Sequence, residues 1–364
     1  MSDTKNIVFL GFLPGFGGAE KSMTMIANGL AKLGNKVTII SFKDNNVVYE
    51  MDDQVQYKFI EDHEKKKIQV LSNRFNELKK VLTEISPDIV ISFWLQPAIY
   101  AALISRFQGF KTIYAERADP SGQAYNGLAG FARKIIFPII DGFVFQTEGA
   151  KSFFSRSIQD KGIVINNPVY IKYGDYNAPE KRRKTIINVG RLHRQKNQHL
   201  LIDAFAKVNK IYPEYTLEIY GEGELEKELK QKIEDLNLND RVILKGTTKH
   251  LFNEMLNASL FVLSSDYEGM PNALMEAMAL GLPCISTDCN PGGARELIKN
   301  HDNGLLSERQ SRKDLFNCMK YIIEHPEDAE KMGRRAKEIC FTHSVEKILN
   351  MWENYILKIL KGSF

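Results

Sequence analysis

Residues 7–42 read IVFLGFLPGFGGAEKSMTMIANGLAKLGNKVTIISF, and their pattern predicts the fold class. The apolar run at 7–12 predicts a buried strand, and a glycine-rich turn at 14–18 follows. The next segment carries apolar residues at helical spacing and stops at Gly34, and the run 37–42 predicts a second strand. A strand, a helix and a strand in this order form a β-α-β unit, which implies a parallel sheet.

The same alternation continues and then restarts, which predicts two α/β domains. Continuously apolar runs, typical of strands that are covered on both faces, lie at 89–93, 111–115, 143–146, 163–165, 185–189, 217–220, 242–245, 260–263 and 284–286. Helices are expected at 197–211, 225–236, 312–325 and 328–340. We therefore expect an N-terminal domain over 1–170, a linker over 171–184, a C-terminal domain over 185–343 and a final helix over 344–364.

The composition is that of a globular protein, and it excludes several classes of function. The chain has 364 residues, 43% of them hydrophobic, and a formal charge of +4 from 49 basic and 45 acidic residues. This near balance gives no reason to expect a nucleic-acid partner, and no apolar run reaches the ~18 residues of a membrane-spanning helix. No signal sequence precedes the first strand, so we expect a cytoplasmic protein. The four cysteines are not spaced for metal binding, and we expect them to be reduced, mostly buried thiols.

The glycine turn at 15–18 approaches two nucleotide-binding motifs and fits neither. Glu20 stands where a dinucleotide fingerprint needs glycine or alanine, and where a P-loop needs the glycine before its lysine and serine. What remains is a helix N-terminus at Gly17 and Gly18, whose backbone N–H groups can face an anion. A turn that serves packing alone is the equally weighted alternative.

Two loops in the second half carry charged residues where parallel strands end. The first loop follows the strand at 185–189 and holds Gly190, Arg191 and Lys196, which offers two cations for a diphosphate. The second loop follows the strand at 260–263 and reads SSDYEGMPNALME over residues 264–276.

The second loop runs into a predicted helix whose first position suits Pro271. Backbone N–H groups at 269–272 then point out of the helix N-terminus, where the macrodipole favours an anion. Glu268 lies before the helix and Glu276 on its second turn, and both carboxylates can accept sugar hydroxyls. A diphosphate flanked by two polyols has the shape of a nucleotide sugar.

These elements together resemble family 4 of the retaining glycosyltransferases, and the resemblance spans nearly the whole chain. It rests on Glu268-x7-Glu276, on Gly190-Arg191-Leu192 with 195–197, on 17–20, and on 290–296 with 303–306. The resemblance implies the α/β GT-B fold: two Rossmann-like domains with parallel sheets that face each other across a cleft. It also implies that the C-terminal helix packs back on the N-terminal domain.

The resemblance implies a role for each site residue. Arg191 and Lys196 bind the donor diphosphate, and Glu268 contacts the transferred sugar; these three residues are the catalytic set. Glu276 binds the ribose hydroxyls. The donor-binding residues as a group are Gly17, Gly18, Gly190, Glu222, Gly269, Met270, Pro271, Asn272 and Glu276.

The implied reaction is the transfer of a hexose or N-acetylhexosamine, with N-acetylgalactosamine as the best guess, from a UDP-sugar to an undecaprenyl-diphosphate-linked acceptor. Cations and helix N-termini stabilise the leaving diphosphate, and the lack of an Asp-x-Asp pair agrees with a metal-independent, cofactor-free reaction.

Glu116 and Arg117 are expected on the acceptor side. Arg117 replaces the histidine that many members carry there, and its pKa above ~12 prevents it from acting as a base. A surface ion pair of Arg117 with Asp119 or Glu116 is the alternative.

Two alternative functions and one question about membrane contact stay open. A non-hydrolysing UDP-sugar 2-epimerase would share the architecture, and a nucleotide-sugar-binding protein without turnover would share the donor site. Apolar and aromatic residues alternate with basic ones in the segment 130–137, which suggests peripheral contact with anionic lipid on the inner face of the cytoplasmic membrane. The clustered basic residues of this half are the run 65–67, Arg74, Lys79, Lys80, Arg106, Lys111, Arg133 and Lys134. A solvated basic face explains the same residues equally well.

Overall fold

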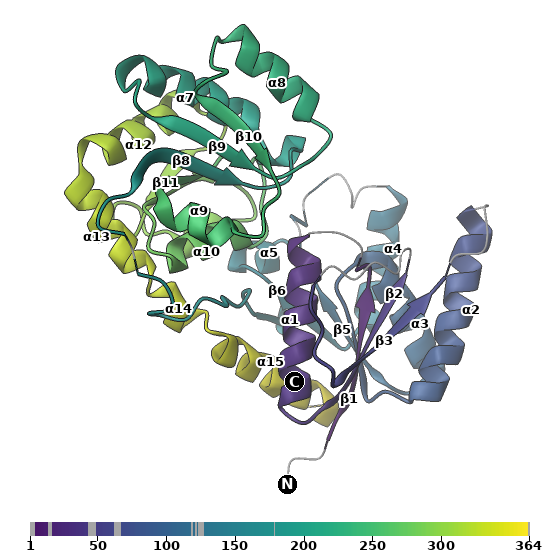
Figure 1. The fold of residues 1–364 in the computed structure, drawn as a ribbon. Helices are drawn as coiled ribbons and strands as arrows, with labels where there is room; N and C mark the ends of the chain where they lie inside the picture. The colour runs from purple at the N-terminus through teal and green to yellow at the C-terminus, as the bar shows by residue number, and fades with distance from the viewer. Residues whose placement is uncertain are drawn as a thin grey trace. The chain divides into compact units, whose positions relative to one another are not determined.

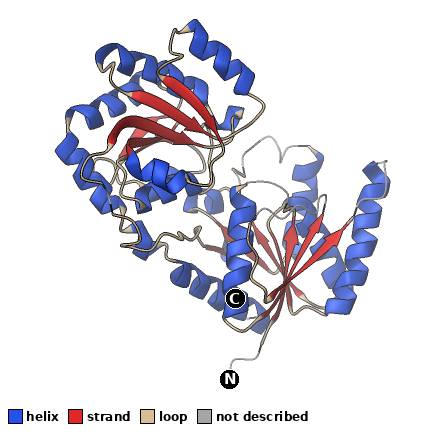
Figure 2. Ribbon diagram, in the orientation of Figure 1, coloured by secondary structure: helices blue, strands red, loops and turns tan. Residues whose placement is uncertain are grey.

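The computed structural model of the protein describes residues 4–13, 17–42, 49–61, 67–117, 119–120, 122, 127–177 and 179–362. The chain forms two compact units (Figure 1). The first unit comprises Met1–Asn167 together with Val345–Phe364, and the second comprises Pro168–Ser344. Each unit has a parallel sheet with helices on both faces (Figure 2), which confirms the prediction of two Rossmann-like α/β halves.

The first unit contains a seven-stranded sheet in the order β3-β2-β1-β4-β5-β6-β7, with parallel neighbours throughout. Its strands are β1 (Asn6–Gly11), β2 (Lys36–Phe42), β3 (Val55–Ile60), β4 (Ile89–Ser92), β5 (Lys111–Ala115), β6 (Gly142–Phe145) and β7 (Gly162–Val164). One face is covered by α1 (Gly18–Lys32) and α15 (Val345–Lys361), the other by α2 (Lys67–Ile85), α3 (Leu95–Gln108) and α4 (Leu128–Ile136). The short helices are η2 (Phe137–Ile139), α5 (Glu148–Ser152) and α6 (Arg156–Asp160).

The C-terminal helix α15 belongs to the first unit, as the family resemblance implied. Trp352 is fully buried, and its ring stacks on that of Phe93 at a centroid distance of 6.3 Å. Leu349 lies against Gly29 of α1, where a Cβ atom would come within 2.3 Å of Leu349 Cδ1. The backbone N–H of Phe143 donates to the Tyr355 hydroxyl at 2.8 Å. These contacts come from the apolar stripe of α15, which therefore serves packing.

The second unit contains a six-stranded parallel sheet in the order β10-β9-β8-β11-β12-β13. Its strands are β8 (Arg183–Val189), β9 (Thr216–Tyr220), β10 (Val242–Gly246), β11 (Ala258–Leu263), β12 (Cys284–Asp288) and β13 (Leu305–Glu308). Its helices are η3 (Arg194–Lys196), α7 (Gln198–Ile211), α8 (Glu226–Asp235), α9 (Leu251–Asn257), α10 (Asn272–Ala279), α11 (Gly293–Leu297), α12 (Arg312–Glu324), α13 (Pro326–Ala336) and α14 (Ile339–Thr342). Strands β8 and β11 are neighbours, so the two loops that follow them meet at one edge of the sheet.

Several elements differ from the sequence-based expectations. The sequence did not predict β3 or β13: β3 buries fully only its end residues, and β13 has four residues, so neither is a continuous apolar run. The single helix predicted over 328–340 is wrong, because α13 ends at Ala336 and α14 begins at Ile339. The segment 171–184, predicted as a linker, lies in the second unit, and the chain passes between the units at Asn167–Pro168 and Ser344–Val345.

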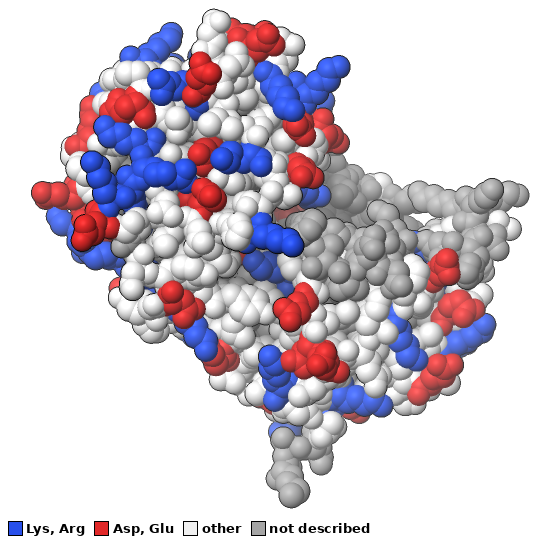
Figure 3. Space-filling view, in the orientation of Figure 1, with Lys and Arg blue, Asp and Glu red and all other residues white. Residues whose placement is uncertain are grey.

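The surface and the thiols agree with the composition. Acidic and basic side chains are intermixed on the face drawn in Figure 3, as the small formal charge of +4 leads one to expect. All four cysteines are free, and Cys284, Cys289 and Cys340 are buried, whereas Cys318 is partly exposed. Within the described part of the chain, no helix is long and apolar enough to cross a membrane.

Candidate functional site

The loop between β8 and α7 is shaped by local caps. The His193 ring accepts a hydrogen bond through Nδ1 from the backbone N–H of Gln195 at 3.2 Å and begins η3. Asn197 has a positive φ of 44°, and its side-chain Oδ1 accepts from the N–H of Leu200 at 3.2 Å, which caps α7. Because η3 turns the chain back, the Lys196 side chain lies over Gly190, where a Cβ atom would meet Lys196 Cε at 3.2 Å.

The loop after β11 is tied to this first loop by hydrogen bonds. The hydroxyl of Ser264 donates to the Lys196 carbonyl at 2.8 Å, and the backbone N–H of Asp266 donates to the Gln195 carbonyl at 2.8 Å. The Gln195 side-chain amide returns a bond to the Tyr267 carbonyl at 2.9 Å. The two charged loops that the sequence singled out separately are therefore one structure.

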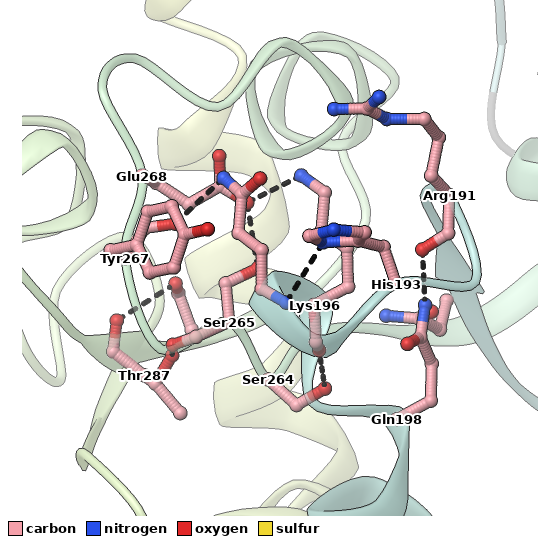
Figure 4. A network of polar contacts seen from close by, with 12 residues as sticks. Arg191, His193, Lys196, Gln198, Ser264, Ser265, Tyr267, Glu268 and Thr287 are labelled. Atoms are coloured by element: carbon pink, nitrogen blue, oxygen red, sulfur yellow. Dashed lines mark hydrogen bonds and ion pairs between the residues drawn. The ribbon is translucent and has the colours of Figure 1, made fainter. Parts of the chain in front are cut away.

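Lys196 and Glu268 form an ion pair at the centre of the joined loops (Figure 4). Lys196 Nζ lies 2.5 Å from Glu268 Oε1, and the Ser265 hydroxyl donates to the same oxygen at 2.6 Å. The side chains are 18% and 8% exposed. An ammonium and a carboxylate that are shielded from water to this degree attract each other more strongly than an ion pair on the surface does.

The N-terminus of α10 follows Glu268 directly. Met270 and Pro271 are buried, and Pro271 occupies the N-cap with an extended backbone, φ −78° and ψ 100°. The prediction that Pro271 is the first helical residue is therefore wrong by one position, since α10 begins at Asn272. Glu276 lies on the second turn of α10 and is partly exposed.

The segment 290–296 contacts the backbone of the loop that joins β11 to α10. The backbone N–H of Glu268 donates to the Asn290 carbonyl at 2.9 Å. Gly293, the first residue of α11, approaches the Gly269 backbone so closely that a Cβ atom would lie 1.8 Å from the Gly269 carbonyl oxygen. Only glycine fits there. The Asn-Pro-Gly-Gly run at 290–293 thus fixes the backbone just before α10.

Two further predicted donor residues, Arg191 and Glu222, lie in or beside the joined loops. Arg191 is exposed, its guanidinium stands apart from the Lys196–Glu268 pair in Figure 4, and no carboxylate of the described residues lies within ion-pair distance of it. Glu222 follows β9, and its carbonyl accepts from the N–H of Leu192 at 3.0 Å. The Thr247 hydroxyl donates to Glu222 Oε1 at 3.2 Å. Glu222 therefore lies beside the β8 loop.

The remaining predicted residues lie in the first unit. Gly17 is the N-cap of α1, which begins at Gly18, so the expected helix N-terminus is present. Gly15 of the same turn lies outside the described residues. Glu116 is 1% exposed and accepts hydrogen bonds from the Tyr114 hydroxyl and from the N–H of Arg117, both at 3.1 Å.

Arg117 is partly buried, and within the described residues its guanidinium contacts an aromatic ring and an amide oxygen in place of the surface ion pair that was the alternative. Its guanidinium lies over the Phe93 ring at 4.1 Å from the centroid and donates to Asn167 Oδ1 at 3.0 Å. Its Nε and Nη2 atoms are buried and have no hydrogen-bond partner among the described residues. Burial lowers the pKa of Arg117 to about 9, while the charge of Glu116 opposes that shift. The group therefore remains a cation at neutral pH.

The sequence did not identify three polar residues that contact Glu268, Arg117 or a partner of Arg117. Ser265 contacts Glu268, and Asn167 accepts from both Arg117 and Gln146, the latter at 2.8 Å. The serine pair directly after the apolar strand at 260–263 was a usable signal for Ser265. Asn167 and Gln146 gave no local signal, because their role depends on contact with a residue far along the chain. Among the described residues, no group of His, Cys, Asp and Glu is arranged to hold a metal ion.

Comparisons with known proteins bear on both units. A family model described as glycosyl transferases group 1 matches residues 175–339, and one described as glycosyl transferase 4-like matches residues 18–116. A glycosyltransferase of Methanocaldococcus jannaschii is 32% identical over 332 residues, which cover 77% of this chain and 82% of that protein. An N-acetylgalactosamine-N,N'-diacetylbacillosaminyl-diphospho-undecaprenol 4-alpha-N-acetylgalactosaminyltransferase of Campylobacter jejuni is 28% identical over 361 residues, covering 94% of this chain and 97% of that protein.

Solved structures agree with the fold. Anabaena HepE in complex with UDP and glucose has a TM-score of 0.79 at 18% identity, covering 96% of this chain and 98% of the other. Sucrose-phosphate synthase from Thermosynechococcus elongatus has a TM-score of 0.85 at 17% identity, covering 98% and 100%. At this identity the similarity shows the fold alone.

Proposed function

This chain belongs to the group 1 glycosyltransferases, and from that premise we propose a specific reaction. It transfers a hexose or N-acetylhexosamine from a UDP-sugar, with retention of the anomeric configuration, to a hydroxyl of a sugar on a lipid diphosphate. N-acetylgalactosamine is the first candidate for the transferred sugar. The observation that carries the proposal is the Lys196–Glu268 pair directly before the N-terminus of α10.

The donor diphosphate is proposed to bind at the N-terminus of α10. The backbone N–H groups of the first helical turn point out of the helix end, and the positive end of the macrodipole favours an anion there. Lys196 lies beside this end of the helix, and the exposed Arg191 can turn toward the same anion. As the bond to the sugar breaks, negative charge grows on the diphosphate, and these groups stabilise it without a metal ion.

Glu268 and Glu276 are proposed to hold the two sugars of the donor. A carboxylate accepts hydroxyl hydrogen bonds through both oxygens, and Glu268 uses Oε1 for Lys196 and Ser265. Its other oxygen is then the acceptor for the transferred sugar, while Glu276 accepts from the ribose. Lys196 thus orients Glu268 and contacts the diphosphate side of the same donor.

Retention is proposed to proceed by attack on the face from which the diphosphate leaves. A phosphate oxygen then takes the acceptor proton, and no protein base is needed. Arg117 stands in the position of the histidine found in other members, and it stays protonated at neutral pH because its lowered pKa is still about 9. It is suited to binding an anion or a hydroxyl, and unsuited to removing a proton.

The acceptor class comes from the relatives. The Campylobacter jejuni protein that matches 94% of this chain acts, by its name, on a diphospho-undecaprenol-linked sugar. We assign the same class of acceptor to this chain, with Glu116 and Arg117 on its side of the reaction. A lipid-linked acceptor places the reaction at the cytoplasmic surface of a membrane.

The proposal is tested in two steps. Thermal unfolding with UDP, GDP, ADP or NAD, each with EDTA, should show a shift for UDP; a ligand at ~100 times its Kd stabilises by ~2.7 kcal/mol. Transfer from a panel of UDP-sugars to undecaprenyl-diphosphate-linked acceptors is then followed, and the anomeric configuration of the product is determined by NMR. Inverted product or a strict metal requirement contradicts the mechanism.

The same two steps separate the alternatives. Conversion of the UDP-sugar into its epimer without any acceptor identifies a 2-epimerase. A shift with UDP and no product with any donor identifies a binding protein without turnover. A shift of the unfolding temperature with GDP or ADP in place of UDP indicates the same type of enzyme with a GDP-sugar or ADP-sugar as its donor.

A further inference from the structure

The outer layer of the first unit exposes large apolar side chains that its fold does not use. Helices α3 and α4 are neighbours on one face of the seven-stranded sheet, and their inner sides bury Ala98, Ala102 and Ile136. Their outer sides expose Leu103, Phe107, Phe131 and Ile135, at 38%, 79%, 63% and 55%. A soluble domain rarely exposes several large apolar side chains on adjacent helices without a partner.

The exposed residues on each helix share one face. Leu103 and Phe107 are four residues apart on α3, and so are Phe131 and Ile135 on α4. The cations Arg106 and Lys134 are exposed beside them, and Lys79 of α2 lies 5.6 Å from the centre of the Phe107 ring. We call Leu103, Arg106, Phe107, Phe131, Lys134 and Ile135 the α3–α4 surface.

The charge on this surface has one sign. Neither α3 nor α4 contains an acidic residue, although 45 acidic residues occur in the chain. No acidic side chain of the described residues pairs with Arg106 or Lys134. Exposed aromatic and aliphatic groups with unpaired cations between them match the boundary of an anionic bilayer, where apolar groups enter the acyl region and cations meet the headgroups.

We propose that the α3–α4 surface docks the protein on an anionic lipid bilayer. The proposal rests on the proposed function, because a lipid-linked acceptor requires the enzyme to work at a bilayer. For Arg74 and Arg133 the structure corrects the expectation of lipid contact. Arg133 and Arg74 are 8% and 9% exposed and lie over aromatic rings of their own unit, and the side chains of the run 65–67 lie outside the described part of the chain.

The first test is flotation with vesicles, carried out without donor or acceptor. The full-length protein is mixed with vesicles of phosphatidylcholine alone or of equal parts phosphatidylcholine and phosphatidylglycerol. We expect binding to the anionic vesicles that weakens with salt. The double variant Phe131→Ser/Ile135→Ser should lower the partition coefficient at least about tenfold, because it removes two buried apolar side chains from the docked state.

Charge and position are tested by two further variants. Lys134→Glu should lower binding to the anionic vesicles by about twenty-fivefold and leave binding to phosphatidylcholine unchanged, since the reversal changes two unit charges and each contributes about a factor of five. Ile211→Ser is the matched control, because Ile211 is 52% exposed on the second unit, close to the 55% of Ile135. It should bind vesicles as the wild-type protein does.

Three outcomes overturn the docking surface. The wild-type protein fails to float with anionic vesicles at low salt, or the double variant floats as well as the wild-type protein, or light scattering shows a dimer that Phe131→Ser converts to a monomer. The last result assigns the surface to a second copy of the chain. Failure of the proposed function is a separate result, namely no transfer to a water-soluble, short-chain acceptor by the wild-type protein. The double variant should retain that soluble transfer and lose transfer to acceptor embedded in vesicles.

Discussion

Lys196 Nζ lies 2.5 Å from Glu268 Oε1, although the two residues are 72 positions apart in the chain. The sequence had assigned them to different parts of the donor, the cation to the diphosphate and the carboxylate to the sugar. Their pairing means that each orients the other before any ligand arrives. A site whose charged groups are already fixed needs little reorganisation when charge develops on the leaving group.

The pair predicts a large loss of turnover on truncation. Lys196→Ala should lower kcat about a hundredfold, the size typical of losing one group that stabilises developing charge. Near-normal turnover in this variant would remove the catalytic role of Lys196. Initial rates with saturating donor and acceptor give the answer.

A double-mutant cycle should separate this pair from an ordinary surface contact. Lys196→Ala and Glu268→Gln should couple by about 1–3 kcal/mol in the free energy of unfolding, because both groups are shielded from water. The matched control is Lys184–Glu214, an ion pair at 3.0 Å with side chains 56% and 45% exposed, for which we expect about 0.2–1 kcal/mol. Equal coupling in the two cycles would show that the Lys196–Glu268 pair is not shielded.

Glu276→Ala should weaken UDP binding. The loss of a carboxylate that accepts hydroxyl hydrogen bonds is worth about 1.5–3 kcal/mol, which is about a tenfold to hundredfold rise in Kd. Isothermal titration with UDP measures it. Glu234→Ala, on the exposed side of α8, is the control and should leave the Kd unchanged. An unchanged Kd in Glu276→Ala would contradict the ribose contact.

Gly293→Ala should impair the donor site by displacing the backbone that precedes α10. The new Cβ atom would meet the Gly269 carbonyl oxygen at 1.8 Å, so the backbone before α10 must move. We expect UDP affinity to fall at least about tenfold, since backbone N–H groups lose their direction toward the anion. Gly174→Ala is the control, because a Cβ atom there meets no other atom within 4 Å. Its backbone strain should lower stability without changing UDP affinity.

Arg117→Met should separate stability from activity. The substitution keeps an unbranched side chain over Phe93 and removes a buried charge with two unpartnered donor atoms. We expect the free energy of unfolding to stay nearly equal, because relief of the guanidinium's burial and loss of its attraction to Glu116 oppose each other, while transfer to the acceptor falls. Arg156→Met, which removes an exposed ion pair with Asp160, is the control and should change stability by less than ~0.5 kcal/mol. A clear destabilisation by Arg117→Met would show that the guanidinium serves the fold.

Buried thiols predict an alkaline loss of stability. Burial raises the pKa of Cys289 to about 12, with a further contribution from the charge of Glu268. Below about pH 9 the thiol is protonated in both states; above it, the unfolded state alone loses the proton, so stability falls as pH rises toward 12. The slope reaches about 1.4 kcal/mol per pH unit for one thiol. Urea denaturation of wild-type protein and Cys289→Ala between pH 8 and pH 10.5 should show that slope in the difference; parallel curves would contradict it.

The local pattern of the sequence was enough to determine the two α/β halves and the placement of the charged loops. Apolar runs such as 185–189 and 260–263 are covered on both faces, so hydrophobicity alone marks them as strands. In a parallel sheet the loops that follow the strands leave from one edge, which placed both charged loops at the same edge without showing that they are neighbours. The pattern failed for β3, whose inner residues are only partly buried, and for the break between α13 and α14.

The tertiary structure decided which groups touch. The Lys196–Glu268 pair, the burial of Arg117 over Phe93 and the contact of Gly293 with Gly269 each join segments that no local period relates. Strand order and packing set these contacts, and a change of neighbours in the sheet would have brought other loops together from the same local elements. The sequence therefore determined the elements and their chemistry. Only the folded chain decided that Arg117, for which a surface ion pair was the alternative, lies partly buried over Phe93, because burial depends on everything packed around a residue.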